Sequence, residues 1–296
     1  MRLRFAVAIL AAALIGGASA CGDEDLQAAR DRVEQTRKDL EQRLERAREQ
    51  FQERRKRFGE RVGEVFAQLE KAFSRPERTS PTVRSRGRNE PTTIDVFLTD
   101  LLGEINRYWT TTLRTAGLPE PRVRYFWVRP GRAVLTACGV PADDRAGFYC
   151  SADDTIYVAQ EFAAELYRGV AEGLPGESAG YGHAAGDFAV AYVLAHEYAH
   201  NLQFELGIFD NSVTASAKPY ELQADCLAGS WAHSVYEEGP LEPGDLEEAT
   251  NAALAVGDFD VGNAQHHGTP QERRDALLVG FNSGEPSQCS QYLPAG

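Results

Sequence analysis

An almost entirely apolar stretch that ends in two histidines constrains the fold of this 296-residue chain more than any other feature. Residues 188–195 read FAVAYVLA and predict a helix, Asp187–Leu206, that is buried on every side. His196 and His200 follow directly and lie four residues apart, so their side chains share one face of that helix. A buried helix has no reason to carry these polar side chains unless something satisfies them. The sequence therefore predicts a core helix with a polar site on one face.

The two histidines belong to an H-E-x-x-H sequence, the pattern in which zinc peptidases present two imidazoles and a carboxylate from one helix. His196 and His200 are suited to bind one zinc ion, and Glu197 to take a proton from the zinc-bound water. The alternative is a partly exposed helix with solvated polar side chains, since so short a motif also occurs by chance. The apolar sequence before the motif favours the buried metal site.

A second helix, expected at Pro219–Glu237, carries the candidate third ligand. A catalytic zinc usually has three protein ligands and leaves one position for water. Glu221 and Asp225 are four residues apart and share a helix face. We assign Glu221 as the third ligand and Asp225 as the acceptor for the N–H of a ligand imidazole. The alternative is a pair of solvated acids on a helix surface.

Seven short segments between Asp95 and Cys289 form an ordered set. They are Cys138-Gly139, Gly147–Cys150, Asp154–Tyr157, Phe188–Gln203, Glu221–Cys226, His267–Thr269 and Gln271–Arg273. In this order they resemble the bacterial neutral zinc metallopeptidase family, a gluzincin-like group. The resemblance implies one zinc ion held by the two motif histidines and Glu221, with Glu197 as the catalytic base.

The resemblance also implies a place for one strand and leaves two positions that differ. The strand read at Asp154–Ala159 borders the cleft in gluzincin-like folds, where an extended substrate can add to its edge. Ala199 and Asn201 stand where the family is expected to have Gly and His. Neither is a proposed ligand, so these differences bear on packing and on the shape of the cleft.

The oxyanion that forms at the attacked carbonyl needs a further hydrogen-bond donor. The candidates are His267, His266 and Tyr220. The adjacent histidines precede a loop that enters a helix, which suits the wall of an active site, although a surface pair is the alternative. We expect His183, in a glycine-rich loop, and His233 to be structural or solvated.

The amino terminus has the form of a signal peptide, residues 1–20. A basic start precedes the short apolar run Phe5–Ile15 and a set of small residues. The run is too short for a stable membrane span. Cleavage after Ala18–Ala20 would release a secreted protein. Lipoprotein processing would instead leave Cys21 lipidated, on the outer face of the cell membrane.

The cysteine count is informative because the chain has five, an odd number for an exported protein. If Cys21 carries lipid, four remain for two disulfides, which sequence alone allows in three pairings. We expect Cys138–Cys150, which closes a short loop, and therefore Cys226–Cys289. Free buried thiols are the alternative, which an oxidising compartment disfavours.

Residues 21–73 predict a membrane-proximal helical stalk. Within Asp23–Phe73 apolar residues recur at sevens, fours and threes, and charged residues fill the other faces. Fully helical, this segment would span roughly 75 Å. Self-association as a coiled coil is one expectation, although the pattern drifts from a strict heptad. A helix folded back onto its own domain is the alternative.

The remaining chain predicts one domain behind a linker. Residues 74–92 are rich in Ser, Pro, Thr and Arg and are typical of a flexible linker. Residues 93–296 suffice for one compact domain. Besides the two site helices we expect the helices Ile94–Thr112, Glu161–Ala171, Asp245–Val256 and Pro270–Phe281, and the strands Arg122–Val128 and Ile156–Val158. The predicted fold class is α+β, mainly helical and gluzincin-like, with a small sheet near the site.

Charge limits the class of partner. Thr93–Gly296 holds 11 basic and 29 acidic residues, a formal charge of −18, whereas Gly22–Thr92 carries +3. Such a domain repels nucleic acid and anionic lipid. Together, the zinc motif, the family resemblance and the amino-terminal sequence predict an exported, membrane-anchored zinc endopeptidase that acts on peptide or protein substrates. The alternatives are a catalytically silent, zinc-stabilised binding module on a stalk, and a scaffold in which the helix does the main work.

Overall fold

The computed structural model describes two units of the chain, Met1–Glu53 and Arg54–Gly296. The described residues are 93–177, 180–181, 185–209, 216–238 and 244–294, with short helical pieces between residues 35 and 53. Those pieces are exposed and fall within the predicted stalk. The predicted signal peptide, Cys21, the linker, His183 and most of the stalk lie outside the described residues. Across the part that is described, no helix combines the length and apolarity needed to cross a membrane.

The domain is mainly helical with two small sheets, as the predicted α+β class requires. Its helices are α2 (Ile94–Ala116), α3 (Gln160–Arg168), α4 (Asp187–Glu205), α5 (Lys218–Glu238), α6 (Asp245–Val256), α7 (Pro270–Ser283) and the 3-10 helix η3 (Pro286–Tyr292). Its strands are β1 (Arg124–Val128), β2 (Val134–Leu135), β3 (Pro141–Ala142), β4 (Gly147–Cys150) and β5 (Thr155–Ala159). The predicted helices and strands are present, α6 with the predicted ends and the others with ends that are shifted. Strands β2, β3 and β4 and helix η3 were not predicted.

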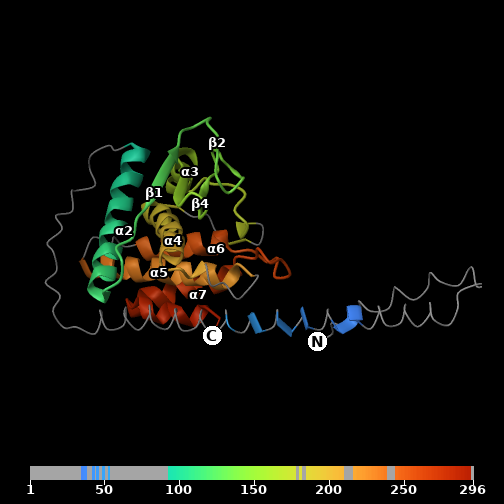
Figure 1. Cartoon of the computed structure of the whole chain (residues 1–296). Coiled ribbons are helices and arrows are strands. Elements are labelled where there is room, and N and C mark those ends of the chain that lie inside the picture. Colours follow the sequence, from blue (N-terminus) through green and yellow to red (C-terminus); the bar gives the residue numbers. More distant parts are fainter. Residues whose placement is uncertain are drawn as a thin grey trace, which may run out of the picture. The chain divides into compact units, whose positions relative to one another are not determined.

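Helix α4 is the central element of the domain. It packs against α2, α3, α5, α6, β4 and β5. The sheet and α3 lie above it in Figure 1, and α5 and α7 lie below. Fifteen of its 19 residues are buried, which agrees with a continuous apolar sequence that has no solvent-facing side. Its polar motif is therefore enclosed by protein.

The larger sheet has three strands in the order β1-β5-β4. Strand β1 pairs parallel to β5, and β4 pairs antiparallel to its other side. Every residue of β5 is buried, as expected for a strand with neighbours on both sides. The implied edge role of Asp154–Ala159 is therefore wrong, because β4 covers that edge. The short strand β4 is itself the edge strand that packs on α4.

Two glycines allow α5 and α7 to pack in direct backbone contact. A Cβ at Gly280 would lie 1.8 Å from the carbonyl oxygen of Cys226, and one at Gly229 would lie 2.0 Å from that of Leu277. Neither position can accept a side chain without separating the helices. This close packing brings the first turns of α7 against the part of α5 that carries the site acids.

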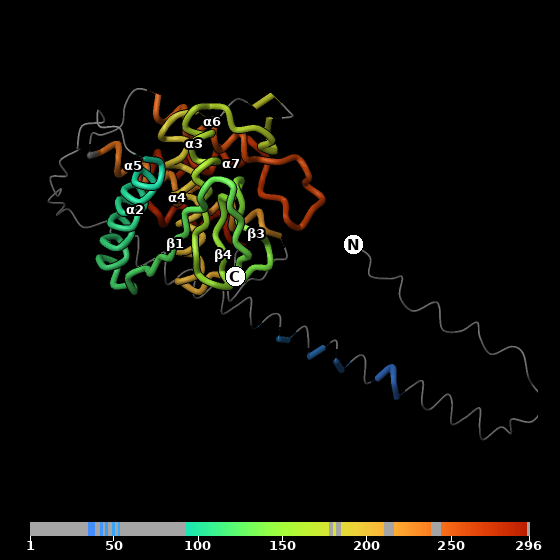
Figure 2. The backbone as a smooth tube through the Cα atoms, turned by 90° about the horizontal axis from the view of Figure 1, so that it is seen from above, coloured from blue at the N-terminus to red at the C-terminus, as the bar shows by residue number. Residues whose placement is uncertain are grey.

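Helix α7 begins with the capping box that the sequence predicts. The Thr269 side chain accepts from the Glu272 backbone N–H, and the Glu272 carboxylate accepts from the Thr269 backbone N–H. Glu272 also pairs with Lys218 in the first turn of α5. In Figure 2 the loop before α7, orange-red and spanning residues 257–269, lies on the side of the domain away from α2. The start of α7 is therefore held at both the loop and the neighbouring helix.

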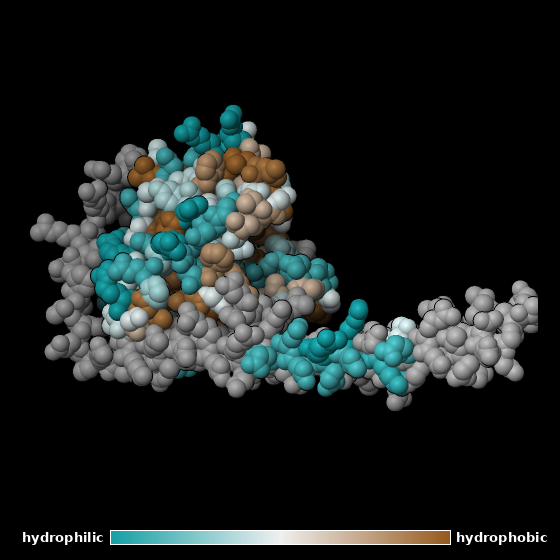
Figure 3. Space-filling view, in the orientation of Figure 1, coloured by the Kyte–Doolittle hydropathy of each residue, from teal (hydrophilic) through white to brown (hydrophobic). Residues whose placement is uncertain are grey.

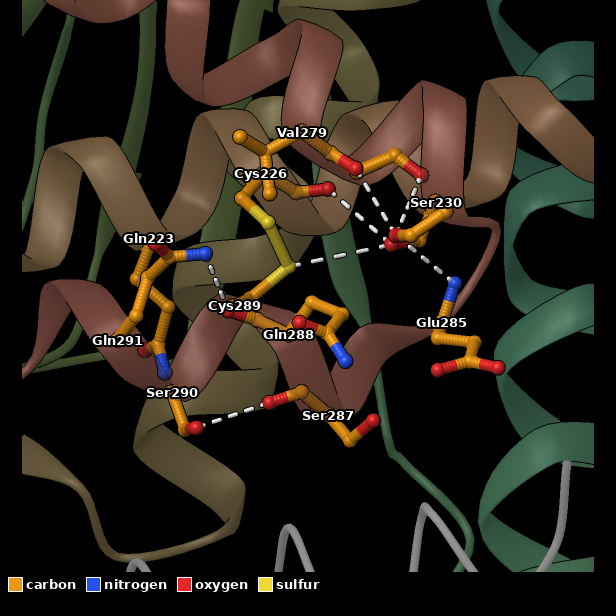
Figure 4. Close-up of a disulfide and its surroundings, with 12 residues drawn as sticks. Gln223, Cys226, Ser230, Val279, Glu285, Ser287, Gln288, Cys289, Ser290 and Gln291 are labelled. Atoms are coloured by element: carbon orange, nitrogen blue, oxygen red, sulfur yellow. Dashed lines mark hydrogen bonds between the residues drawn. A yellow bond between two sulfur atoms is a disulfide. The ribbon is translucent and has the colours of Figure 1, made fainter. Parts of the chain in front are cut away.

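The structure contains both predicted disulfides. Cys138 bonds to Cys150 at the end of β4, and Cys226 of α5 bonds to Cys289 of η3. Figure 4 shows the second bond with Ser230 beside it, whose Oγ lies 3.8 Å from Cys289 Sγ. Each disulfide thus joins a strand or helix of the site to a neighbouring segment.

Candidate metal centre

Three side chains from two helices meet at the centre of the domain. His196 and His200 extend from α4 and Glu221 from α5, and none is more than 14% exposed. The two Nε2 atoms are 3.1 Å apart. Glu221 places Oε2 3.2 Å from His196 Nε2 and Oε1 3.4 Å from His200 Nε2. The predicted ligand set therefore forms one compact group that could hold a metal ion.

This triangle has the size that a tetrahedral zinc site requires. Zinc lies about 2.0–2.1 Å from imidazole nitrogen and carboxylate oxygen, which puts two ligand atoms about 3.3 Å apart. The two imidazole Nε2 atoms are 3.1 Å apart, and the two Glu221 oxygens lie 3.2 Å from one of them and 3.4 Å from the other, which is close to that value. Two nitrogens and one oxygen also match the donor types of catalytic zinc sites. The residues present therefore fit zinc.

Asp225 lies behind His196, as predicted for the acceptor of its N–H. Asp225 Oδ1 is 2.8 Å from His196 Nδ1 and also accepts a 2.6 Å hydrogen bond from the Tyr192 hydroxyl. A carboxylate only accepts, so Nδ1 carries the proton and Nε2 is left to face Glu221. The carboxylate therefore selects the tautomer that a metal ligand needs.

Arg273 of α7 completes this group and was not predicted. Its Nε and Nη2 donate to the two Asp225 oxygens at 2.8 and 2.9 Å, a bidentate pair. Its Nη2 also lies 3.2 Å from each ring nitrogen of His196. Arg273 follows His196 by 77 residues, so helical spacing could not connect them. In the sequence, only the family resemblance points to its segment.

The electrostatics of the group favour a cation at the triangle. Burial acts to lower the pKa of the His196 imidazole, but the Asp225 carboxylate outweighs it and raises the pKa to about 9. Burial acts to raise the pKa of Glu221, but His200 and His196 hold it well below its usual range. The acids thus stabilise positive charge here, which protons or a divalent ion can supply.

Glu197, the candidate base, lies beside the triangle and is 8% exposed. Its Oε2 accepts a 2.8 Å hydrogen bond from the Tyr149 backbone N–H in β4. Burial raises the pKa of its carboxyl above the usual range, against the lowering effect of His196 and His200. Sequence reasoning missed this contact because the short strand β4 was not predicted.

Asn201, one of the two positions that differ from the family pattern, supports the same strand. Its Nδ2 donates to the Arg122 carbonyl at 3.1 Å and to Asp154 Oδ1 at 2.9 Å. The Tyr149 hydroxyl donates to that same Asp154 oxygen at 2.8 Å. Asp154 has a left-handed backbone, with φ of 52°, which needs such support in a residue other than glycine. Asn201 therefore fastens the β4–β5 turn to α4.

The candidate oxyanion donors are spread around the centre. His266 is buried, and its Nδ1 lies 2.5 Å from Asp258 Oδ1. His267 is half-exposed, with Nδ1 3.4 Å from the other Asp258 oxygen. Tyr220 is buried and packs edge-on against Phe209. Among the described residues, no hydrogen bond or ion pair joins either histidine to the ligand triangle.

Two further polar contacts in the domain involve His233 and Gln203. His233 donates from Nδ1 to the Phe281 carbonyl at 2.6 Å, which agrees with its expected structural role. Gln203 on α4 places Oε1 2.8 Å from His200 Nδ1 and was not predicted as part of the site. Its position three residues after His200, on the same helix face, is a signal that could have identified it.

Comparisons with known proteins cover most of the described domain. Residues 56–292 match the model of a family described as "Putative neutral zinc metallopeptidase". The uncharacterized protein YpfJ of Escherichia coli K12 is 38% identical over 177 residues, which cover 53% of this chain and 58% of that protein. The uncharacterized protein Rv2575 of Mycobacterium tuberculosis H37Rv is 30% identical over 204 residues, which cover 60% of this chain and 64% of that protein.

The chain thus spans less than two thirds of the length of either relative, and no solved structure matches it. The family match includes both helices that carry the His–His–Glu triangle. Zinc is the metal that the family implies, and the geometry of the triangle fits it. This protein therefore belongs to that zinc metallopeptidase family.

Proposed function

We propose that this protein is an endopeptidase that hydrolyses peptide bonds with one zinc ion held by His196, His200 and Glu221. The single observation that carries the proposal is the ligand triangle, with separations of 3.1 to 3.4 Å, beside a buried glutamate that is not part of it. Bound zinc supplies an acidified water molecule and polarises the substrate carbonyl. A purely structural zinc site has no need of a carboxylate at position 197.

Glu197 acts as general base and then as general acid. Its carboxylate accepts a proton from the attacking water and passes it to the leaving amine. The Tyr149 N–H holds one carboxylate oxygen, which limits the orientations of the side chain. Burial raises its pKa toward the operating range of a proton carrier, which favours both steps.

Strand β4 is the proposed docking edge for the substrate. It is one of the two edge strands of the three-stranded sheet, and it is half-buried next to Glu197. The Tyr149 N–H points away from β5, so in an antiparallel ladder the backbone groups of Gly147 point the same way. The Tyr149 N–H is bonded to Glu197, so a peptide in extended form can pair with the backbone groups of Gly147 and present its carbonyl near the ligand triangle.

The oxyanion donor is proposed among His267, His266 and Tyr220. His267 combines a half-exposed imidazole with a carboxylate partner, Asp258, that orients it. His266 shares the same partner but is 4% exposed, so reaching a substrate would require the loop to move. His267 is therefore the first of the three to test.

The amino-terminal sequence supports a proposal for where the protein is located. We infer export through the signal peptide 1–20 and lipid anchoring at Cys21 on the outer face of the cell membrane, with secretion as the alternative. Residues 21–73 then serve as a stalk that separates the catalytic domain from the membrane and provides a surface for self-association. The linker 74–92 joins this stalk to the domain.

Zinc content and peptide hydrolysis measured together test the proposal. The full-length protein, Glu197→Gln and the control Glu205→Gln are compared on a mixed peptide library read by mass spectrometry. Glu205 lies on the same helix, 3.7 Å from Arg122, and is not part of the ligand triangle. We expect one zinc ion in all three proteins and a loss of at least about 100-fold in cleavage for Glu197→Gln alone.

Two results would contradict the proposal. Equal cleavage by the wild-type protein and Glu197→Gln would remove the assigned base. A folded wild-type protein that binds zinc but cleaves nothing would favour the zinc-stabilised binding module instead.

A further inference from the structure

Gln203 is a fully buried amide that touches both site helices. It lies on α4, three residues after the ligand His200, and its side chain is 0% exposed. Its Oε1 is 2.8 Å from His200 Nδ1. Its Nε2 is 2.8 Å from the Tyr220 carbonyl oxygen and 2.9 Å from Gln223 Oε1 on α5. The hydrogen-bond partners of its amide are thus all groups in the protein interior.

The surroundings determine which way the amide points. A backbone carbonyl can only accept hydrogen bonds, so the Gln203 atom that faces the Tyr220 oxygen must be the NH₂ group. The reversed amide would place two acceptors against each other in a buried site, which costs free energy comparable to a lost hydrogen bond. The oxygen of Gln203 must therefore face His200.

This orientation in turn selects one tautomer of His200. The Gln203 oxygen cannot donate, so the proton of the contact is carried by His200 Nδ1. The lone pair of the neutral ring is then on Nε2, the atom that lies 3.1 Å from His196 Nε2 and 3.4 Å from Glu221. A zinc ligand must present its lone pair in this direction.

We infer that Gln203 is a positioning residue of the metal centre: it holds His200 in the ligand tautomer and ties it to the backbone next to Glu221. The inference rests on the proposed zinc site and adds a role for a residue outside the ligand set. Tyr220, whose carbonyl anchors the amide, directly precedes the third ligand in α5. The two ligand histidines are thus held by different groups, His196 by a carboxylate and His200 by an amide.

Zinc affinity of the full-length protein tests this role without reference to activity. We would measure it by competition with a chromophoric chelator for the wild type, Gln203→Met and Gln223→Met. Methionine keeps most of the side-chain volume and removes the polar contacts. Gln223 is the matched control, because it is also 0% exposed and in the same network but does not contact His200.

We expect Gln203→Met to weaken zinc binding about 10- to 100-fold, the usual effect of removing a partner of a ligand. Gln223→Met should stay within about twofold of the wild type, because Gln203 keeps its contacts to His200 and the Tyr220 carbonyl. Gln203→Glu should bind zinc more tightly than Gln203→Met, since a protonated carboxyl can accept from His200 and donate to that carbonyl. Equal affinities for Gln203→Met and the wild type would overturn the inference.

Histidine nitrogen NMR of the zinc-loaded wild type tests the tautomer of His200 even if Gln203→Met does not fold. The signals of His200 are identified by their absence in His200→Gln. We expect zinc on Nε2 and a proton in slow exchange on Nδ1. Zinc on Nδ1 would refute the tautomer argument, whereas a wild type without zinc would refute the proposed function itself.

Discussion

Removing the charge of Arg273 should destabilise the domain strongly. Arg273 is 5% exposed and its partner Asp225 is 0% exposed, so solvent screens little of their interaction. Arg273 donates two hydrogen bonds, of 2.8 and 2.9 Å, one to each carboxylate oxygen of Asp225. Arg273→Met leaves Asp225 as a buried charge whose remaining partners are Tyr192 and His196.

The structure permits a magnitude for this loss. Breaking a buried ion pair by removing one partner costs about 3–5 kcal/mol. In a domain of roughly 200 residues each kcal/mol lowers Tm by about 2–4 °C, which gives a decrease of about 6–20 °C. The double substitution Arg273→Met and Asp225→Asn removes both charges. It should regain most of the lost stability, because no unpaired buried charge remains.

The assay is thermal unfolding followed by near-ultraviolet circular dichroism, with a chelator present so that zinc binding does not add to stability. Arg274→Met is the matched control, since Arg274 pairs with Asp275 at 2.6 Å but both side chains are more than a third exposed. Such a surface pair contributes about 0–1 kcal/mol. A decrease in Tm for Arg273→Met no larger than that for Arg274→Met would refute the reasoning.

The other predictions concern acid stability and the disulfides. Burial acts to raise the pKa of Asp258, but hydrogen bonds from the His267 N–H and the His266 ring outweigh it and lower the pKa to about 2, below the unfolded value of 3.8. The resulting stabilisation is complete above about pH 4 and is lost as pH falls toward 2, so the difference in Tm between wild type and Asp258→Asn should shrink over that range; a constant difference would contradict it. Replacing both cysteines of the Cys226–Cys289 disulfide, which closes a loop of 63 residues, should lower the free energy of unfolding in denaturant by about 4 kcal/mol. Replacing both cysteines of the Cys138–Cys150 disulfide, which closes a loop of 12 residues, should lower it by about 3 kcal/mol. The reverse order would show that strain or residual structure outweighs loop entropy.

Some apolar side chains of the domain are exposed to solvent, which their local sequence does not predict. Figure 3 shows apolar surface over the upper part of the domain, in the region of the small strands. Leu135 of β2 is 77% exposed and Val140 before β3 is 48% exposed. A two-stranded hairpin has too few neighbours to bury both of its faces, which explains their exposure.

Local regularities account for the parts of the site that the sequence predicted. The pairs His196–His200 and Glu221–Asp225 share helix faces because 3.6 residues make one turn, and the structure places each pair accordingly. The start of α7 was also predictable, since a capping box is a local arrangement of Thr269, Pro270 and Glu272. The continuous apolar run before His196 correctly indicated a fully enclosed helix.

The contacts that support these residues could not be predicted in the same way. Tyr149 reaches Glu197 from a four-residue strand without a clear alternating pattern, and its place at the sheet edge depends on pairing with β5. Arg273 reaches Asp225 because two glycines let α5 and α7 touch. Gln203 could be connected to His200 by helical spacing, but its anchor at the Tyr220 carbonyl lies on another helix.

The sequence by itself determined a mainly helical α+β domain, a core helix with two histidines and a glutamate on it, and a second helix with paired acids. These features depend on residues that are near in the chain, where helix geometry fixes relative positions. The tertiary structure alone decided that the ligand triangle closes to 3.1–3.4 Å, that β4 forms the sheet edge beside Glu197, and that Arg273 neutralises Asp225. Each of these depends on the packing of segments distant in sequence, whose separation is set by side-chain volume and by glycine contacts and not by any local pattern.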